Sequence, residues 1–262
     1  MTLIDKISKK EIISKLKHRL EPLAYIYALW IEGSDANGTS DEFSDIDIWM
    51  DIADAKENDA IEAAEKALLE LAEFDYKYIM RHNHPKIRQR IYHLKGSSEY
   101  LMIDFCWQLH SRPKDDYSYY TNDPIEKVKI LFDKDNIIRY KELNQDEFLA
   151  SNNIRLEEMQ YRYTQHSRVI KYVLRDQYLE AFAYYQRYVI EPLVFLLRML
   201  YTPAYTDYGF VHITHHIPKE SSEKLEYLVK VSSLEDIKIK ITEAERWFNK
   251  LTEQLKLKPY VK

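Results

Sequence analysis

The sequence has little cysteine and no surplus of basic residues. A single cysteine, Cys106, in 262 residues excludes an internal disulfide framework and any cysteine-based zinc site. The formal net charge of -5 argues against a dedicated nucleic-acid binder, because phosphate contacts need clustered lysine and arginine. This cysteine usage is typical of a protein from a reducing cytoplasm.

Long apolar runs are also missing. The longest, PLAYIYALWI, has about half of the roughly 20 residues that a membrane-spanning helix needs. The start of the chain, MTLIDKISKKEIISKLKHRLE, is charged throughout and lacks the apolar segment of a secretory signal. We therefore expect a cytoplasmic protein without a membrane anchor.

Glycine is scarce, with four residues in the whole chain. The sequence contains no GxxxxGK[ST], GxGxxG or GxSxG motif, so P-loop, dinucleotide-binding and hydrolase-elbow folds have no support. Two of the four glycines, Gly33 and Gly38, fall in one short stretch, EGSDANGTSDEFSDIDIW. That stretch is either a polar turn or a catalytic loop.

The chain as a whole changes periodicity at about Asn144. Before it, helical spacing alternates with extended stretches, among them LAYIYALWI, DIDIWMDI and an edge-strand candidate, VKILFDKDNII. After it, helical patterns cover 144–176, 178–200, 222–231 and 235–256. We predict an α+β fold: a mixed sheet flanked by helices over 1–143, and an all-helical domain over 144–262.

Two aspartates open the second predicted strand. Alternate side chains of a strand share a face, so Asp45 and Asp47 would point one way while Ile46 and Ile48 enter the core. Two carboxylates about 4 Å apart repel by roughly 4 kcal/mol at an effective dielectric of 20, so a cation is expected between them. Magnesium fits, since one or two carboxylates plus substrate phosphates typically hold it.

Three further residues extend this candidate site. At the end of the preceding strand, Gly33 allows close backbone approach to a ligand, and Ser34 offers a hydroxyl to phosphate oxygens. Asp104 lies in the apolar run EYLMIDFCW, where an aspartate is costly unless it is paired or bound to metal. If Asp104 lies on a neighbouring strand, the loop is half phosphate cradle and half metal site.

This pattern resembles the signature of the nucleotidyltransferase superfamily, which includes DNA polymerase beta and the aminoglycoside and lincosamide nucleotidyltransferases. The family has Gly-Ser, a short gap, Asp-x-Asp at the start of a strand and an acidic residue on a later strand. Here these are Gly33-Ser34, Asp45-Ile46-Asp47 and Asp104. The order of elements over about 20–140 and the helical half behind it also resemble the family.

The resemblance implies an enzyme in which an acceptor hydroxyl attacks the α-phosphorus of a nucleoside triphosphate, most simply ATP, and pyrophosphate leaves. By resemblance, Asp45 and Asp47 hold two magnesium ions, and Asp104 completes the second metal site or activates the hydroxyl. The implied acceptor is a small molecule such as an aminoglycoside- or lincosamide-like antibiotic. Related enzymes often build their pocket across two subunits, which suggests a homodimer.

Basic residues of the helical half are further candidates. Arg168, Lys171 and Arg175 fall at i, i+3 and i+7 of one predicted helix face. Since helical-domain lysines reach phosphates in related enzymes, Lys171 and Arg168 are predicted to bind the nucleotide, although a solvated basic stripe has the same spacing. The tyrosines at 184, 185 and 188 are expected mostly to pack, with some lining an acceptor pocket.

The nine histidines give no clear metal signal. His82 and His84 would share a strand face, and a second cluster consists of His212, His215 and His216. Zinc would need further ligands, and no HExxH motif supplies them, so ordinary polar histidines are favoured. The second cluster is also placed to border an acceptor pocket.

Simpler interpretations of the loop remain open. A calcium loop fails the EF-hand pattern, because position six is Ser40 and position twelve is Ile46. A plain turn, capped by Asp41, Ser44 and Asp45, would fit a lone Asp-x-Asp. Asp51, in phase on the same strand, is expected at a solvated strand end.

Three other functions compete with the small-molecule enzyme. A protein-modifying adenylyltransferase of the antitoxin type is one, although the long helical half counts against it. A nucleotide-binding module without turnover is the second. A nucleic-acid polymerase with the same core is the third, and the acidic charge balance disfavours it.

Overall fold

The chain divides into two compact units, Met1–Leu143 and Asn144–Lys262, in a computed structural model that describes residues 7–81, 83–114 and 118–256. Each unit has a hydrophobic core of its own. No helix within the described ranges is both long and apolar enough to cross a membrane. The candidate site residues between Gly33 and Asp104 all belong to the first unit.

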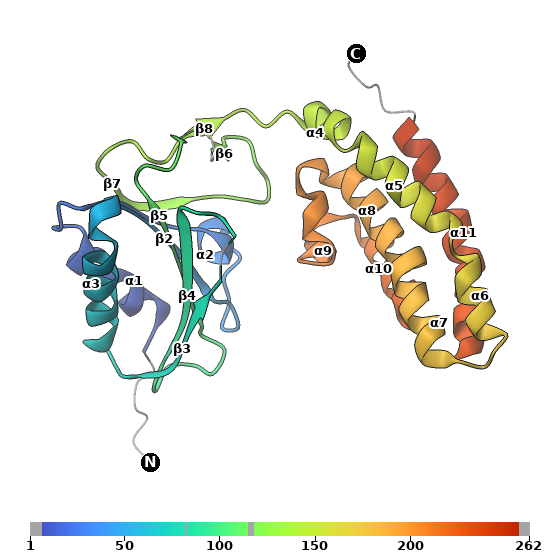
Figure 1. Ribbon diagram of the computed structural model, residues 1–262, viewed down its shortest axis with the longest axis horizontal. Coiled ribbons are helices and arrows are strands. Elements are labelled where there is room, and N and C mark those ends of the chain that lie inside the picture. The colour runs from blue at the N-terminus through green and yellow to red at the C-terminus, as the bar shows by residue number, and fades with distance from the viewer. Residues whose placement is uncertain (1–6, 82, 115–117, 257–262) are drawn as a thin grey trace. The chain divides into compact units, whose positions relative to one another are not determined.

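The first unit, coloured blue to green in Figure 1, is built on a six-stranded mixed sheet. The order of the strands is β3-β4-β5-β2-β1-β7. Its strands are β1 (Ile26–Ile31), β2 (Ile46–Ile52), β3 (Phe74–Met80), β4 (Ile87–Leu94), β5 (Ile103–Leu109) and β7 (Lys129–Asp133). Neighbours are antiparallel except β2 and β5, which run parallel. The predicted edge strand in VKILFDKDNII is confirmed as β7. A separate short pair joins β6 (Tyr119–Tyr120) to β8 (Tyr140–Lys141).

Helices α1 (Lys9–Leu20) and α3 (Glu57–Leu69) share one core with the sheet. Helix α1 starts at a capping box, in which the Ser8 hydroxyl accepts from the Glu11 amide at 3.3 Å and Glu11 accepts from the Ser8 amide at 2.8 Å. Strand β2 contributes Ile46, Ile48, Met50 and Ile52 to this core. Because side chains of a strand alternate, Asp47, Trp49 and Asp51 lie on the opposite face of the sheet.

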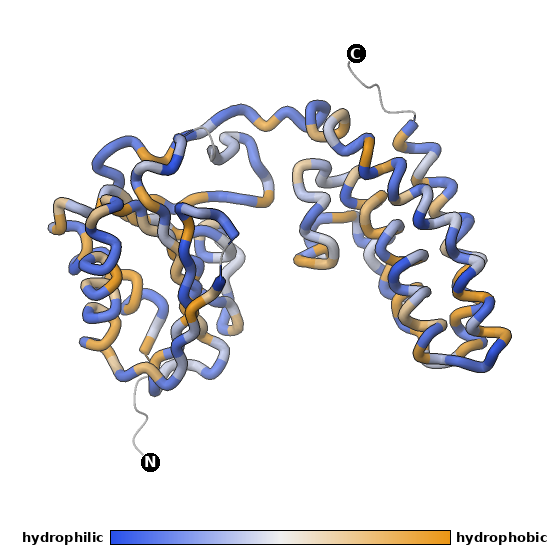
Figure 2. The backbone as a smooth tube through the Cα atoms, in the orientation of Figure 1, coloured by the Kyte–Doolittle hydropathy of each residue, from blue (hydrophilic) through white to orange (hydrophobic). Residues whose placement is uncertain are grey.

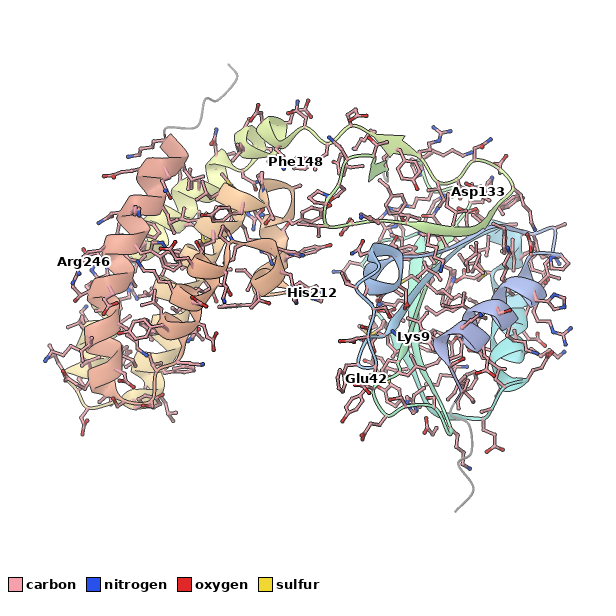
Figure 3. All side chains as sticks on the ribbon, turned by 180° about the vertical axis from the view of Figure 1, so that it is seen from behind. Lys9, Glu42, Asp133, Phe148, His212 and Arg246 are labelled. Atoms are coloured by element: carbon pink, nitrogen blue, oxygen red, sulfur yellow. The ribbon has the colours of Figure 1, made fainter. Side chains whose placement is uncertain are left out.

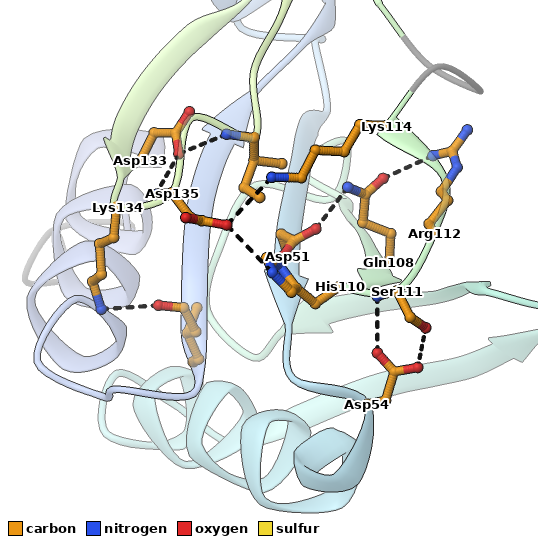
Figure 4. Close-up of polar contacts among 12 residues, drawn as sticks. Asp51, Asp54, Gln108, His110, Ser111, Arg112, Lys114, Asp133, Lys134 and Asp135 are labelled. Atoms are coloured by element: carbon orange, nitrogen blue, oxygen red, sulfur yellow. Dashed lines mark hydrogen bonds and ion pairs between the residues drawn. The ribbon is translucent and has the colours of Figure 1, made fainter.

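Asp51 is fully buried, so the expectation of a solvated strand end was wrong. The Gln108 amide donates to one oxygen of Asp51 at 2.7 Å, and His110 Nδ1 lies 2.7 Å from the other (Figure 4). His110 Nε2 in turn lies 3.3 Å from Asp135, which follows β7. Burial raises the pKa of Asp51, while its two hydrogen bonds oppose that rise. This network connects β2, β5 and the segment after β7.

The second unit is helical. Its elements are α4 (Gln145–Ser151), α5 (Asn153–Thr164), α6 (Ser167–Val173), α7 (Tyr178–Tyr185), the π-helical turn η3 (Gln186–Ile190), α8 (Glu191–Tyr201), the 3-10 helix η4 (Pro203–Tyr208), α9 (Ile213–His216), α10 (Lys219–Val229) and α11 (Leu234–Lys256). Hydrophobic and hydrophilic residues alternate along these helices (Figure 2), and α8 is buried from Pro192 to Met199. The α+β prediction is confirmed.

The predicted helix over 144–176 is broken into α4, α5 and α6. At the first break, the Asn152 side chain donates to the Phe148 carbonyl at 2.8 Å and to the Pro203 carbonyl at 3.0 Å. Asparagine side chains compete with helical backbone bonds in this way, which ends α4. The helical pattern over 178–200 continues through η3, as predicted.

Candidate active site

Asp45 and Asp47 flank the first residue of β2. Ile46 and Ile48 have no exposed surface and lie in the core, as the alternation predicted. Asp45 is exposed and accepts a hydrogen bond from the Met102 amide at 3.3 Å, whereas Asp47 is half-buried. The two aspartates therefore share the face of the sheet that is turned away from α1 and α3.

Asp104 lies directly opposite Asp47. Strands β2 and β5 are paired in parallel so that the Cα of Asp47 is the partner of the Cα of Asp104. Directly paired residues project from the same face of a sheet, so the two carboxylates are neighbours although 57 positions separate them. Asp104 thus lies on the neighbouring strand, the placement on which the predicted site depended.

The carboxylates are crowded by further negative charge. The pKa of Asp47 is raised to about 6, mainly by burial and then, in decreasing order, by the negative charges of Asp104, Asp45, Glu32 and Asp35. Burial also raises the pKa of Asp104, and the hydrogen bond from Gln89 opposes this rise. No described residue donates a hydrogen bond to the Asp47 carboxylate, so its charge is the least compensated of the three.

Gly33 makes room for Asp47. The backbone at Gly33 is left-handed, with φ of +61°, and a Cβ there would lie 2.0 Å from Asp47 Oδ2. The Glu32 amide donates to the Asp47 backbone carbonyl at 3.0 Å, which holds the start of the loop against β2. Ser34 follows in the short helix α2 (Gly33–Asn37), which ends at the left-handed Gly38. Gly33 and Asp47 are therefore side by side, and Ser34 is the next residue of the chain.

Part of the loop is a simple turn. The Asp41 carboxylate accepts from the Phe43 amide at 3.0 Å and from the Ser44 hydroxyl at 2.7 Å. This turn lies before Asp45 and uses neither Asp45 nor Asp47. The turn and the carboxylate pair are consecutive parts of one segment, so the two interpretations of the loop are compatible.

Two charged residues of the site gave no signal in the sequence. Lys9 extends from α1 (Figure 3) to the Ser40 hydroxyl at 2.7 Å and lies 3.5 Å from the Asp35 carboxylate. Glu32 accepts hydrogen bonds from the Trp30 indole, at 3.1 Å, and from the Tyr119 hydroxyl. Burial raises the pKa of Glu32 as well. Only the position of Glu32, next to Gly33, would have drawn attention to it.

The donor set fits a divalent cation that arrives with phosphate ligands. In the described part of the chain, no group of three or more histidine, cysteine, aspartate or glutamate side chains is placed to hold a metal ion alone. Magnesium, however, needs only one or two carboxylates when a substrate supplies phosphate oxygens. Asp47 and Asp104 provide that pair, and the uncompensated charge at Asp47 favours a cation there.

Arg168 and Lys171 lie in the other unit, on α6. Both side chains are exposed, and the Arg168 Nε donates to Gln165 at 3.0 Å. Helix α6 ends at Val173, so the predicted stripe stops there and Arg175 lies in the turn that follows. The nucleotide-binding role of Arg168 and Lys171 stays a prediction.

The tyrosines and histidines separate into packing and surface groups. Tyr185 is fully buried and donates to the Leu228 carbonyl at 3.0 Å, which makes it a core residue. Tyr184 lies with its ring centroid 5.4 Å from that of Tyr188.

His216 Nδ1 lies 2.8 Å from the buried Arg198 guanidinium, while His212 is exposed at the start of α9 (Figure 3).

His84, predicted to lie on a strand, does not lie on one. Strand β3 ends at Met80 and β4 begins at Ile87, which puts His84 in the connection. There its Nδ1 accepts from the Lys86 amide at 3.1 Å. His82 lies outside the described residues.

Comparison with known proteins gave matches only among solved structures. No model of a protein family and no curated protein matches the chain. An aminoglycoside 6-adenyltransferase from Bacillus subtilis matches with a TM-score of 0.37 and 15% identity, over 94% of this chain and 88% of that one. A spectinomycin adenyltransferase from Enterococcus faecialis, with ATP and spectinomycin, matches with a TM-score of 0.30 and 14% identity, over 92% and 100%. With TM-scores this low, we infer function from the side chains of the chain itself.

Gly33→Ala is expected to destabilise the protein more than Gly38→Ala. Both glycines have positive φ, which costs alanine about 1–2 kcal/mol, but only at Gly33 would the new Cβ meet a neighbour, Asp47 Oδ2. Around Gly38 there is nothing within 4 Å. Urea unfolding of the two variants, repeated in an Asp47→Ala background, tests this. In that background the two losses should become equal, and equal losses in the wild-type background would contradict the account.

Asp47→Asn should stabilise the protein at pH 7.5. A carboxyl whose pKa is higher in the folded state binds its proton more strongly there, so stability falls as pH rises from about 4 to about 6. The full rise corresponds to roughly 3 kcal/mol, which solvent screening at a half-exposed group reduces to about 1 kcal/mol. Urea unfolding should show this gain at pH 7.5 and little of it at pH 4.5. A loss of stability at pH 7.5 would count against the crowded-carboxylate description.

Proposed function

We propose that the chain is a metal-dependent nucleotidyltransferase that transfers a nucleoside monophosphate, most simply AMP from ATP, onto a hydroxyl of a small molecule. The observation that carries the proposal is the pairing of Asp47 with Asp104 across two parallel strands, with the bare backbone of Gly33 against Asp47. Such a pair, with uncompensated negative charge, suits a cation bound to a triphosphate better than a purely structural role.

The reaction exchanges one phosphorus–oxygen bond for another. The acceptor oxygen forms a bond to the α-phosphorus, the bond between that phosphorus and the β-phosphate oxygen breaks, and pyrophosphate leaves. The acceptor proton passes to a base. Asp104 is the candidate base, or else it completes a second metal site, because its carboxylate lies beside that of Asp47.

The remaining residues are assigned to binding. Asp45 and Asp47, with Asp104, would hold magnesium, which when bound neutralises the charge of the triphosphate and its transition state. Gly33 and Ser34 would contact phosphate oxygens, since Gly33 has no side chain to block a ligand. From the helical unit, Arg168 and Lys171 would add positive charge, and most of the catalytic effect would come from positioning and electrostatics.

The acceptor is proposed to be an antibiotic-like polyhydroxyl compound of the aminoglycoside or lincosamide class. A cytoplasmic location and a homodimer belong to the same proposal. The helical unit would supply the acceptor-binding surface, because its exposed tyrosines and histidines can pack their rings against a sugar ring and form hydrogen bonds with its hydroxyl groups. Lysines and arginines gather on no tract that would suit a nucleic acid instead.

Pyrophosphate release from ATP and magnesium, measured across aminoglycosides, spectinomycin and lincosamides, tests the proposal. One acceptor class should stimulate release, and Asp45→Asn and Asp47→Asn should each lower it about 100-fold or more, because the charge that stabilises the transition state is lost. Asp59→Asn, on the exposed surface of α3, should leave the rate unchanged.

Other outcomes would redirect or contradict the proposal. A partner protein that gains the mass of AMP would assign the activity to protein modification. Extension of a labelled RNA or DNA primer would assign it to nucleic acid. ATP binding that is unaffected by Asp47→Asn, without release against any acceptor, would contradict it.

A further inference from the structure

Gln89 is the strongest hydrogen-bond partner of the carboxylate pair. Gln89 lies on β4, with Cys106 as its Cα partner on β5, and reaches diagonally to Asp104, two positions earlier on that strand. Its Nε2 lies 2.7 Å from one oxygen of Asp104 and 2.8 Å from the other. The amide nitrogen thus spans both oxygens of one carboxylate.

The other contacts of the two facing carboxylates are weak by comparison. Asp104 has a second donor in the Cys106 thiol, at 3.7 Å, and a thiol is a poor donor. The Asp47 carboxylate receives no hydrogen bond from the described residues. Within that part of the chain, therefore, Gln89 is the main hydrogen-bond donor that fixes the orientation of the Asp104 carboxylate.

The position of the amide limits how Asp104 can bind. An ionised carboxylate has about four lone-pair sites, two on each oxygen, and Gln89 occupies the side between the oxygens. A cation could not chelate both oxygens from that side. A cation could therefore bind Asp104 through only one carboxylate oxygen at a time. The plane of the carboxylate, which Gln89 fixes, determines the direction in which that oxygen points.

We infer that Gln89 is a positioning residue: it fixes Asp104 so that one carboxylate oxygen serves the cation or the acceptor beside Asp47. This inference rests on the proposed function, in which Asp104 binds a metal ion or accepts the proton of the acceptor hydroxyl. Outer hydrogen bonds of this kind orient metal ligands, and losing one typically weakens metal binding about 10- to 100-fold.

The same sheet contains a matched control. Gln108 on β5 donates its amide to Asp51 on β2 at 2.7 Å, again from one strand to its neighbour. Asp51 and Gln108 are fully buried and belong to the network with His110 (Figure 4), four positions along each strand from Asp47 and Asp104. Removing the Gln108 amide disturbs an equivalent contact that lies outside the candidate site.

The test is binding of Mn²⁺ to the full chain, with a non-hydrolysable ATP analogue present, followed by electron paramagnetic resonance. Gln89→Met keeps the length of the side chain but has no N–H donor, and Gln89→Leu is a second variant in case the first fails to fold. Gln108→Met is the control. We expect the Gln89 variants to bind Mn²⁺ about 10- to 100-fold more weakly than wild type, and Gln108→Met to bind it like wild type while losing stability in urea.

Two results would overturn the inference while leaving the proposed function in place. Either the Gln89 variants bind Mn²⁺ as tightly as wild type, or Gln108→Met weakens binding equally, which would show a general effect of disturbing the sheet. The proposed function itself fails, and the inference with it, if Asp47→Asn binds Mn²⁺ as tightly as wild type or if wild type binds none.

Discussion

The parallel pairing of β2 with β5 is the constraint on which the candidate site depends. It places Asp47 opposite Asp104, and a slip of one residue would turn one strand's aspartates into the core. The core on the other face of the sheet stabilises this register, because Ile46, Ile48 and Ile103 are packed there and none of them has exposed surface. Burying each such side chain contributes about 1.5–3 kcal/mol, so together they outweigh the roughly 4 kcal/mol of repulsion between two carboxylates at close range.

The surroundings of the pair divide its charge unequally. Asp104 is held by the Gln89 amide, and Asp45 by a backbone amide, but Asp47 lies against the bare backbone of Gly33 without a donor among the described residues. Its raised pKa expresses the same imbalance. A fold that keeps an uncompensated carboxylate near four others gains nothing in stability, and a cation carried by a triphosphate would supply the missing charge.

Local pattern was enough to predict the parts of the site that lie within one strand. The alternation around Ile46 and Ile48 predicted the face that Asp45 and Asp47 share, and the apolar run around Asp104 marked that residue as a candidate, whereas its place beside Asp47 became known only from the pairing of the strands. Residues that reach the site from other elements were missed, because nothing in their own segments indicates the contact: Gln89 depends on the antiparallel register of β4 with β5, and Lys9 on the docking of α1.

The errors have the same origin. The period-two pattern predicted the face on which Asp51 lies but not what covers it, and in the fold His110 and Gln108 bury it. Helical spacing ran through Asn152 without a break, whereas the side chain of Asn152 bonds to the Pro203 carbonyl, 51 positions away, and ends α4 there. Sequence periodicity describes one element at a time, and these outcomes were decided by contacts between elements.

The central claim is that the carboxylate pair binds a cation together with a nucleoside triphosphate. Calorimetric titration of a non-hydrolysable ATP analogue into the full chain, with magnesium and again with EDTA, tests it most directly. The account predicts binding with magnesium and a loss of at least about tenfold in affinity without it, since bare phosphates would meet uncompensated carboxylates. Equal affinity in magnesium and in EDTA would contradict it.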